Sequence, residues 1–482
     1  MTTNATKSRS IVATPDVHLF ARYLLRRLGC THVIDVGCAQ PRELAKIHPK
    51  AGIVGLGIGV DLRRARSEYP WGRWVDWNPE SDVFETVLPE MASKSVVVSV
   101  IDSESPTTPR LVESLKRLLD HAPAALVASR PGTSVEGFRA LLESAGFCID
   151  FIGRTAGDNV DFAKDTPLAV LGNNHRPALS QAPPGYRVVA MVAAYNEEDI
   201  IVPSLEGMIE QGADVYLLDN WSTDRTVERA EQFLGCGVVA IERFPKEGRS
   251  DTFPYISILT RKAELAAELE ADWFIHMDVD EIRQSPWPGM TLKDALYHVD
   301  VQGFNAVDHT VFVFRPIDNG YVENSSFEAY FRHFLVLASV HQTQVKAWKN
   351  AGRPVDLVTH YGHEVEFAGR RIYPYNFLYR HYPTRSQQQG ERKILARQTR
   401  MDAQEVAAGW HRHWSRIQAG HNFLQDPSGL TSLDETDIYE EFLVERLGSI
   451  GPDERADWAT RRQDRPAWRR VAGRVRRRLR GR

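Results

Sequence analysis

Residues 273–281 read WFIHMDVDE, a run of five mostly apolar residues followed by three acids within four positions. The apolar run predicts a buried β-strand, and alternate residues of a strand share one face. We therefore expect Asp278 and Asp280 to point the same way at the carboxyl end of that strand, where α/β sheets bind ligands. Two carboxylates placed there suit Mg²⁺ or Mn²⁺. The alternative is a solvated acidic turn.

Strand-like and helical patterns alternate on both sides of this stretch. Nearby, the expected strands are Arg187–Ala194, Asp214–Leu218, Val238–Ile241 and Trp273–Met277. Upstream, they are His32–Val36, Ile53–Val60, Ser95–Ile101 and Ala124–Ala128. Helical periodicity separates most of them, as in Val17–Leu28, Leu111–Leu119, Ile200–Gln211 and Thr260–Glu270. This alternation predicts an α/β protein with two Rossmann-like doubly wound units and a helical C-terminal region.

A polar, Pro-rich stretch, NNHRPALSQAPPG, separates the two units and predicts a linker at 173–185. The expected organisation is a first α/β domain at 1–172, a second at 186–400, a helical region at 401–460 and a basic tail at 461–482.

The net charge of −4 over 482 residues hides an asymmetry. Residues 461–482 hold eleven Arg and one Asp, while the other 460 residues hold 48 basic and 62 acidic side chains, a net charge of −14. Trp468, Val471, Val475 and Leu479 follow a helical spacing in the tail. That pattern predicts a surface helix for an anionic membrane, and the alternative is a solvated basic tail.

No signal peptide or spanning segment is visible, and the four Cys are scattered without a CxxC pair. These features favour a cytoplasmic protein, with the tail placing it at the inner face of the membrane.

Three motifs occur in order: AAYNEE at 193–198, LDNWSTDRT at 218–226 and ADWFIHMDVDE at 271–281. Together they resemble the signatures of family 2 glycosyltransferases with a GT-A fold. The resemblance implies a nucleotide-sugar donor and a glycan or lipid-linked acceptor. The donor nucleotide would lie along a set of residues on these motifs and on the helix before the acidic strand: Ala193, Tyr195, Glu197, Asp219, Asn220 and Arg261.

The same resemblance implies a Mn²⁺ or Mg²⁺ ion held by Asp278 and Asp280. In the later stretch YRHYPTRS, at 379–386, His381 is the candidate third metal ligand. His360 and His363 are its rivals. Arg385 and Lys393 are the candidates for diphosphate binding.

An inverting transfer needs a general base near the acceptor. The acids Asp308 and Glu328 are the candidates for that role, and the alternative is that both are ordinary surface acids.

The stretch VIDVGCA at 33–39 resembles the first motif of class I SAM-dependent methyltransferases. The resemblance implies that Asp35, Gly37 and Asp61 bind SAM. The glycine-rich loop of that family is reduced to Gly37. This departure leaves open a degenerate domain used for docking or acceptor binding.

Three hypotheses follow. The main one is a metal-dependent, inverting glycosyltransferase. The second is a bifunctional glycosyltransferase and SAM-dependent methyltransferase. The third is a nucleic-acid-associated protein that uses the Arg-rich tail, for which no nucleic-acid-binding motif provides support.

Overall fold

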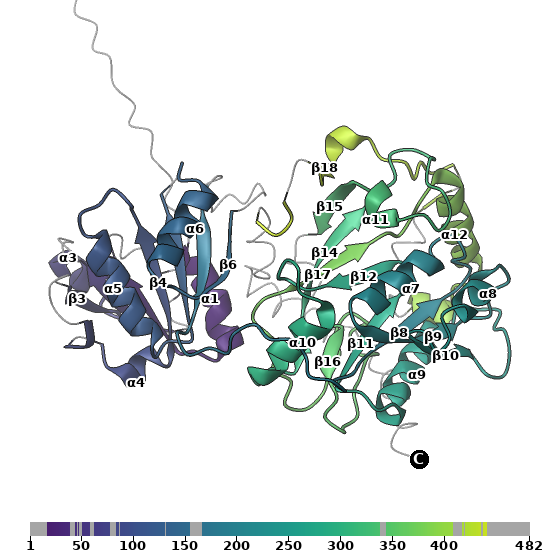
Figure 1. Ribbon diagram of the computed structural model, residues 1–482, viewed down its shortest axis with the longest axis horizontal. Helices are drawn as coiled ribbons and strands as arrows, with labels where there is room; N and C mark the ends of the chain where they lie inside the picture. The colour runs from purple at the N-terminus through teal and green to yellow at the C-terminus, as the bar shows by residue number, and fades with distance from the viewer. Residues whose placement is uncertain are drawn as a thin grey trace, which may run out of the picture. The chain divides into compact units, whose positions relative to one another are not determined.

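The structure is a computed structural model of the chain. It describes residues 17–38, 44–45, 47, 51–57, 62–77, 83–85, 87–130, 132–154, 166–337, 344–407, 417–418, 420–434 and 437–440. Two compact units are present (Figure 1). Unit 1 comprises the described residues from Val17 to Arg176 together with Ile438–Glu440, and unit 2 comprises those from Pro177 to Asp437. The basic tail at 461–482 and Asp61 lie outside the described residues.

Unit 1 contains a seven-stranded sheet in the order β3-β2-β1-β4-β5-β7-β6. All neighbouring strands are parallel except at β7, which is antiparallel to β5 and β6. The order reverses between β1 and β4. The strands are β1 His32–Val36, β2 Gly52–Gly57, β3 Arg73–Asp76, β4 Ser95–Ile101, β5 Ala124–Ser129, β6 Ile149–Gly153 and β7 Leu168–Gly172.

Helices pack on this sheet through apolar stripes. Helix α5 buries Leu111, Leu115, Leu118 and Leu119, which recur at the spacing of one helix face. Helix α6 begins where the Ser134 hydroxyl accepts a hydrogen bond from the Gly137 amide. The helices of unit 1 are α1 Val17–Leu28, α3 Leu62–Glu68, α4 Pro89–Ala92, α5 Thr108–Leu119 and α6 Val135–Ser144.

Unit 2 has a six-stranded sheet in the order β10-β9-β8-β11-β16-β13. Strands β10, β9, β8 and β11 are parallel, and β16 and β13 extend the sheet in antiparallel fashion. The order reverses between β8 and β11. The strands are β8 Val188–Ala194, β9 Ala213–Asp219, β10 Val238–Arg243, β11 Trp273–Asp278, β13 Ala306–Val307 and β16 Ala347–Lys349.

A second sheet of unit 2 begins directly after the acidic loop, and its strand pairing was not predicted. It has the order β12-β17-β14-β15-β18. Strand β12 pairs with β17 so that Glu281 lies opposite His381, which brings a residue 100 positions later to the acidic loop. The strands are β12 Glu281–Gln284, β14 His309–Phe314, β15 His333–Leu337, β17 Phe377–His381 and β18 Thr431–Ser432.

The helices of unit 2 are α7 Ile201–Glu210, α8 Thr226–Glu231, α9 Tyr255–Glu268, α10 Leu292–Val301, α11 Phe327–Tyr330, α12 Gln387–Thr399 and α13 Ala403–Ala407. The expected helical region after residue 400 is only partly present. Among its described residues, α13 is followed by extended chain and the short strand β18. Gly420, Pro427 and Gly429 explain the change, because these residues interrupt helices.

The predicted α/β class with a doubly wound sheet is therefore confirmed. Within the described residues, no helix is both long enough and apolar enough to cross a bilayer.

Candidate functional site

A pocket lies in unit 2 at the carboxyl ends of β8, β9 and β11, beside the point where the strand order reverses. Open α/β sheets bind ligands in this position because the loops diverge there. The pocket contains about 650 Å³ of space, including its open mouth. Its lining residues lie at or just after the three strand ends and in or next to α9 and α12: Ala193, Ala194, Tyr195, Glu197, Asn220, Phe253, Ile258, Asp278, Val279, Asp280, Lys393, Arg397 and Arg400.

The two aspartates of the acidic loop both line the pocket, as predicted, but their surroundings differ. The Asp278 carboxylate forms no hydrogen bond or ion pair with any described residue, and burial together with nearby Glu281 raises its pKa. Burial alone would also raise the pKa of Asp280. However, Lys393 and His381 outweigh that effect and hold it well below its ordinary value. One carboxylate is thus already neutralised by the protein, while the other faces the pocket without a partner.

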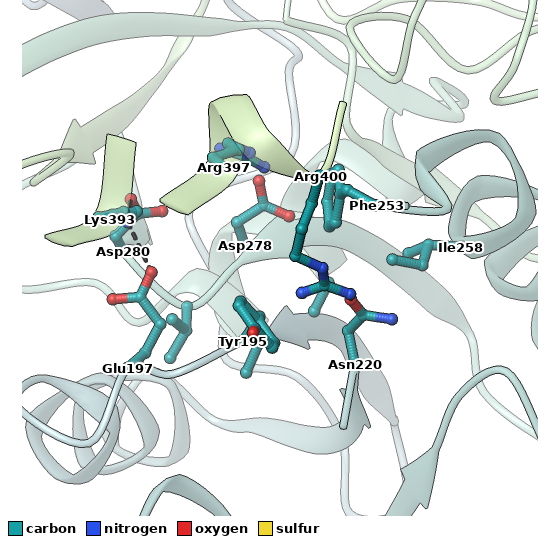
Figure 2. Close-up of a pocket in the computed structure, with 13 residues that line it drawn as sticks. Tyr195, Glu197, Asn220, Phe253, Ile258, Asp278, Asp280, Lys393, Arg397 and Arg400 are labelled. Carbon is teal, nitrogen blue, oxygen red and sulfur yellow. Dashed lines mark hydrogen bonds and ion pairs between the residues drawn. The ribbon is translucent and has the colours of Figure 1, made fainter. Parts of the chain in front are cut away.

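The cation paired with Asp280 is Lys393, a residue of α12 (Figure 2). The Lys393 Nζ lies 2.8 Å from the Asp280 Oδ2 and 2.6 Å from the Glu197 Oε1. Arg385 extends this network below the pocket, because its guanidinium contacts Glu197 and donates to both Asp199 oxygens at 2.8 and 2.9 Å. Lys393 therefore lines the pocket, whereas Arg385 is a buried ion-pair partner that does not line it.

Two arginines of the pocket stack on aromatic rings. The Arg400 guanidinium lies 4.3 Å from the centre of the Tyr195 ring, and Arg397 lies 4.6 Å from that of Phe253. Arg400 also donates to the Asn220 side-chain oxygen at 3.3 Å. Such contacts are typical of sites that receive flat or anionic groups.

Six lining residues were not among the predicted site residues. Ala194 and Val279 lie within the quoted motifs, and four lie outside them: Phe253, Ile258, Arg397 and Arg400. A signal for the two arginines was present. Lys393, Arg397 and Arg400 follow one another at intervals of four and three residues, which places them on one face at the end of α12.

Several other predicted residues lie away from the pocket. Arg261 is held by Glu242 of β10 and Glu268 of its own helix. Asp219 is fully buried and accepts hydrogen bonds from the Ser222 amide, and burial raises its pKa.

Neither predicted base reaches the pocket. Asp308 is buried, and its Oδ1 accepts from the backbone amides of His309 and Gln344 at 2.9 and 2.8 Å. Glu328 accepts from the Gln284 side chain at 3.3 Å. Both acids satisfy local polar groups, which is a structural role, so the geometry does not support the predicted catalytic role.

The three candidate histidines have different partners and positions. The His381 Nε2 lies 3.7 Å from the Asp280 Oδ2, next to the acidic loop as predicted. His360 instead pairs with Glu366 at 3.1 Å, close to Glu364. His363 contacts the Gln344 side chain at 3.0 Å.

Asp278 and Asp280 supply the oxygen donors of a hard divalent cation, although the ligand atoms of Asp278, Asp280 and His381 do not all lie within 4.8 Å of one another, as those of His360, Glu364 and Glu366 do. Asp278 offers an unpartnered carboxylate, Asp280 lies two residues further on, and His381 is beside it. Mg²⁺ and Mn²⁺ prefer such oxygen donors and keep water or ligand phosphate at their remaining positions.

A polar network lies behind the pocket floor. Lys262 is fully buried, and its Nζ contacts the His276 Nδ1 at 2.9 Å and donates to the Met277 carbonyl at 2.7 Å. Burial lowers the pKa of Lys262 to about 8. Burial and this ammonium also hold the pKa of His276 well below its ordinary value. These groups support β11 from within.

In unit 1 the corresponding edge lies between β1 and β4, where that sheet reverses its order. Gly37 follows β1 with a φ of +81°, and a Cβ added to it would lie 3.0 Å from the Leu111 side chain. The Asp35 carboxylate is 3.1 Å from the His18 Nε2, and both side chains are buried. The structure thus places Asp35 and Gly37 together at the switch point.

No protein-family model matches the chain, and no curated protein matches it. Ninety chains of solved structures do match. A ribosomal protein L11 methylase from Lactobacillus delbrueckii subsp. bulgaricus is 14% identical, with 33% of this chain and 77% of that one covered at a TM-score of 0.23. A magnesium protoporphyrin IX methyltransferase from Synechocystis, solved with bound SAM, is 14% identical. The match covers 35% of this chain and 86% of that one, with a TM-score of 0.23. The sugar N-methyltransferase KedS8 from a Streptoalloteichus species is 12% identical. The match covers 36% of this chain and 96% of that one, with a TM-score of 0.25.

These neighbours over the N-terminal third contradict the predicted main function. They include SAM-dependent methyltransferases, and the prediction that the chain is a glycosyltransferase is wrong. The physical reason is that acids and polar loops at strand ends mark a ligand site in many α/β proteins without determining its reaction. Residues of the three motifs line the pocket of unit 2, but the motifs did not determine its chemistry.

Proposed function

We propose that unit 1 binds SAM and that the protein is a SAM-dependent methyltransferase. The observation that carries the proposal is the turn at Gly37, which lies at the switch point between β1 and β4. A glycine with positive φ lets the backbone approach a ligand closely, because no Cβ intervenes. Ligands of doubly wound sheets bind at this position. When bound there, SAM supplies an electrophilic methyl group.

The residues of unit 1 provide binding and orientation. Asp35 is fixed by His18, so its carboxylate is held at the end of β1. The Ser99 hydroxyl of β4 donates to the Val36 carbonyl at 2.8 Å and ties the two strands of the switch point together. The turn at Gly37 is therefore supported from both sides.

Titration calorimetry with SAM tests the proposal. Gly37→Ala forces a side chain into a left-handed conformation and towards Leu111, and we expect it to weaken SAM binding at least about tenfold. Gly146→Ala is the matched control. Gly146 has a φ of +77°, lies beyond α6 in the loop that leads to β6, and would place its Cβ no closer than 3.8 Å to another residue. No binding of SAM by the wild-type chain at millimolar concentration would refute the proposal.

A second candidate function rests on the pocket of unit 2, which we propose binds a nucleoside diphosphate together with Mg²⁺ or Mn²⁺. The observation in its favour is that both acidic and basic side chains line the pocket. The unpartnered Asp278 suits the cation, and Lys393, Arg397 and Arg400 suit phosphate. Tyr195 provides an aromatic face for a base.

Equilibrium binding of UDP, GDP and dTDP with Mg²⁺ tests this second function. Asp278→Asn removes one metal-binding carboxylate while keeping the shape, and we expect at least about a tenfold loss in Mg²⁺-dependent affinity. Glu228→Gln is the control, because Glu228 is an exposed acid on α8 outside the pocket. Equal binding by wild type and Asp278→Asn would exclude Asp278 as a ligand of the cation.

A further inference from the structure

Lys393 occupies the place between two carboxylates that an inorganic cation would need. Its ammonium bridges the Glu197 Oε1 at 2.6 Å and the Asp280 Oδ2 at 2.8 Å (Figure 2). These acids come from the loops after β8 and β11, which are far apart in sequence. The bridge therefore joins the two strand ends that form the pocket.

The two carboxylates depend on Lys393 unequally. Glu197 also contacts Arg385, so it keeps a cation if Lys393 leaves. Besides Lys393, Asp280 has His381 at 3.7 Å and the more distant charge of Arg385. If Lys393 moves away, Asp280 is left as a buried carboxylate with little compensation, which is costly unless another cation arrives.

Lys393 is suited to movement, whereas Arg385 is not. Lys393 lines the pocket, and its side chain is a flexible four-carbon chain that ends in a single charge. Arg385 is fully buried and donates two parallel hydrogen bonds to Asp199, a geometry that fixes the guanidinium.

We propose that Lys393, the resident counter-ion of Asp280 and Glu197, competes with a divalent cation for Asp280. In the ligand-free pocket its ammonium holds the two acids together. When a divalent cation enters beside Asp278 and Asp280, the ammonium is displaced towards the pocket, where it meets the phosphate of the ligand. This inference rests on the cation site of the second proposed function and assigns Lys393 a role in setting its affinity.

The test measures binding of Mn²⁺ alone, from the electron paramagnetic resonance signal of the free ion. Lys393→Met keeps the length of the side chain and removes the competing charge. We expect it to bind Mn²⁺ at least about tenfold more tightly than wild type, which corresponds to about 1.4 kcal/mol. Lys246→Met removes the same charge from an exposed site near Glu242, and its Mn²⁺ affinity should stay within about twofold of wild type. Unchanged or weaker binding by Lys393→Met would overturn the inference.

A double variant locates the effect. Lys393→Met with Asp280→Asn also removes the carboxylate for which the ion competes, so the gain in Mn²⁺ affinity should disappear. A gain that persists would place the ion elsewhere and overturn the inference. Lys393→Gln provides a second neutral side chain if Lys393→Met does not fold. The outcome is separate from that of the nucleotide assay, because tighter Mn²⁺ binding by Lys393→Met stands even if no nucleoside diphosphate binds.

Discussion

Arg385 is the residue whose loss the structure predicts most sharply. It is buried, contacts Glu197, and donates at 2.8 and 2.9 Å to Asp199. Replacing it by Met keeps the volume but leaves Asp199 as a buried charge without its partner. Breaking a buried ion pair in this way costs about 3–5 kcal/mol. We therefore expect Arg385→Met to lower the free energy of unfolding of unit 2 by about that amount at pH 7.

The lowered pKa of Asp199 determines how the stability loss in Arg385→Met depends on pH. Burial alone would raise the pKa of Asp199, but Arg385 outweighs it, and the pKa is lowered. The ion pair therefore adds stability above the unfolded pKa of about 3.9, and this is lost as the pH falls through the lowered value. In Arg385→Met the pKa of Asp199 should instead be raised by burial. The carboxylate then takes up a proton as the pH approaches 4, so the deficit of the variant should shrink.

Urea unfolding at pH 7 and pH 4 measures both effects, and hydrogen exchange of β8 peptides assigns the change to unit 2. Arg187→Met is the control. Arg187 pairs with Asp214 at 2.7 Å, but both side chains are more than one-third exposed, so we expect a loss below about 1 kcal/mol. A loss for Arg385→Met no larger than that of the control would refute the reasoning about the buried network.

Two further predictions concern the floor of the pocket. Gly362 has a φ of +74°, and a Cβ there would lie 2.6 Å from the Tyr255 hydroxyl and 3.0 Å from the His276 Nε2. We therefore expect Gly362→Ala to lower the free energy of unfolding of unit 2 by about 1–3 kcal/mol, measured by urea unfolding. The pKa of Lys262 is lowered to about 8, so the unfolded chain binds more protons above that pH, and wild-type stability should rise by up to about 2 kcal/mol between pH 8 and 9.5. Lys262→Met should lack this rise, and an equal rise in both proteins would contradict the assignment.

Local sequence patterns were enough to predict the strands that form the pocket. The run from Trp273 to Met277 is apolar, so burial on both faces requires a strand within a layered α/β unit, and the acids after it must lie at the sheet edge. The same logic placed β1 and β8. It failed for the sheet that begins at β12. Its five strands pair through contacts between distant segments, such as Glu281 with His381, and their turns carry no fixed spacing.

Several predicted site residues lie away from the pocket because a partner distant in the sequence already binds them. Arg261 and Arg385 were both expected near phosphate, and both are held by carboxylates from other strands or loops. Asp308 was a candidate general base, but its oxygen accepts hydrogen bonds from the amides of the adjacent His309 and of Gln344, which is 36 residues away in the sequence. A charged side chain in a sequence shows what it can bind, whereas the fold determines whether that capacity is already used.

The charges of the pocket explain why a cation and an anion should enter it together. Its lining acids are Glu197, Asp278 and Asp280, and its lining cations are Lys393, Arg397 and Arg400, so their formal charges cancel. A divalent cation alone would have to displace Lys393 and leave an excess of positive charge. A polyphosphate alone would approach the unpartnered Asp278 and be repelled. A pair of the two changes the net charge little and gives each displaced side chain a new partner, so we expect their binding to be cooperative.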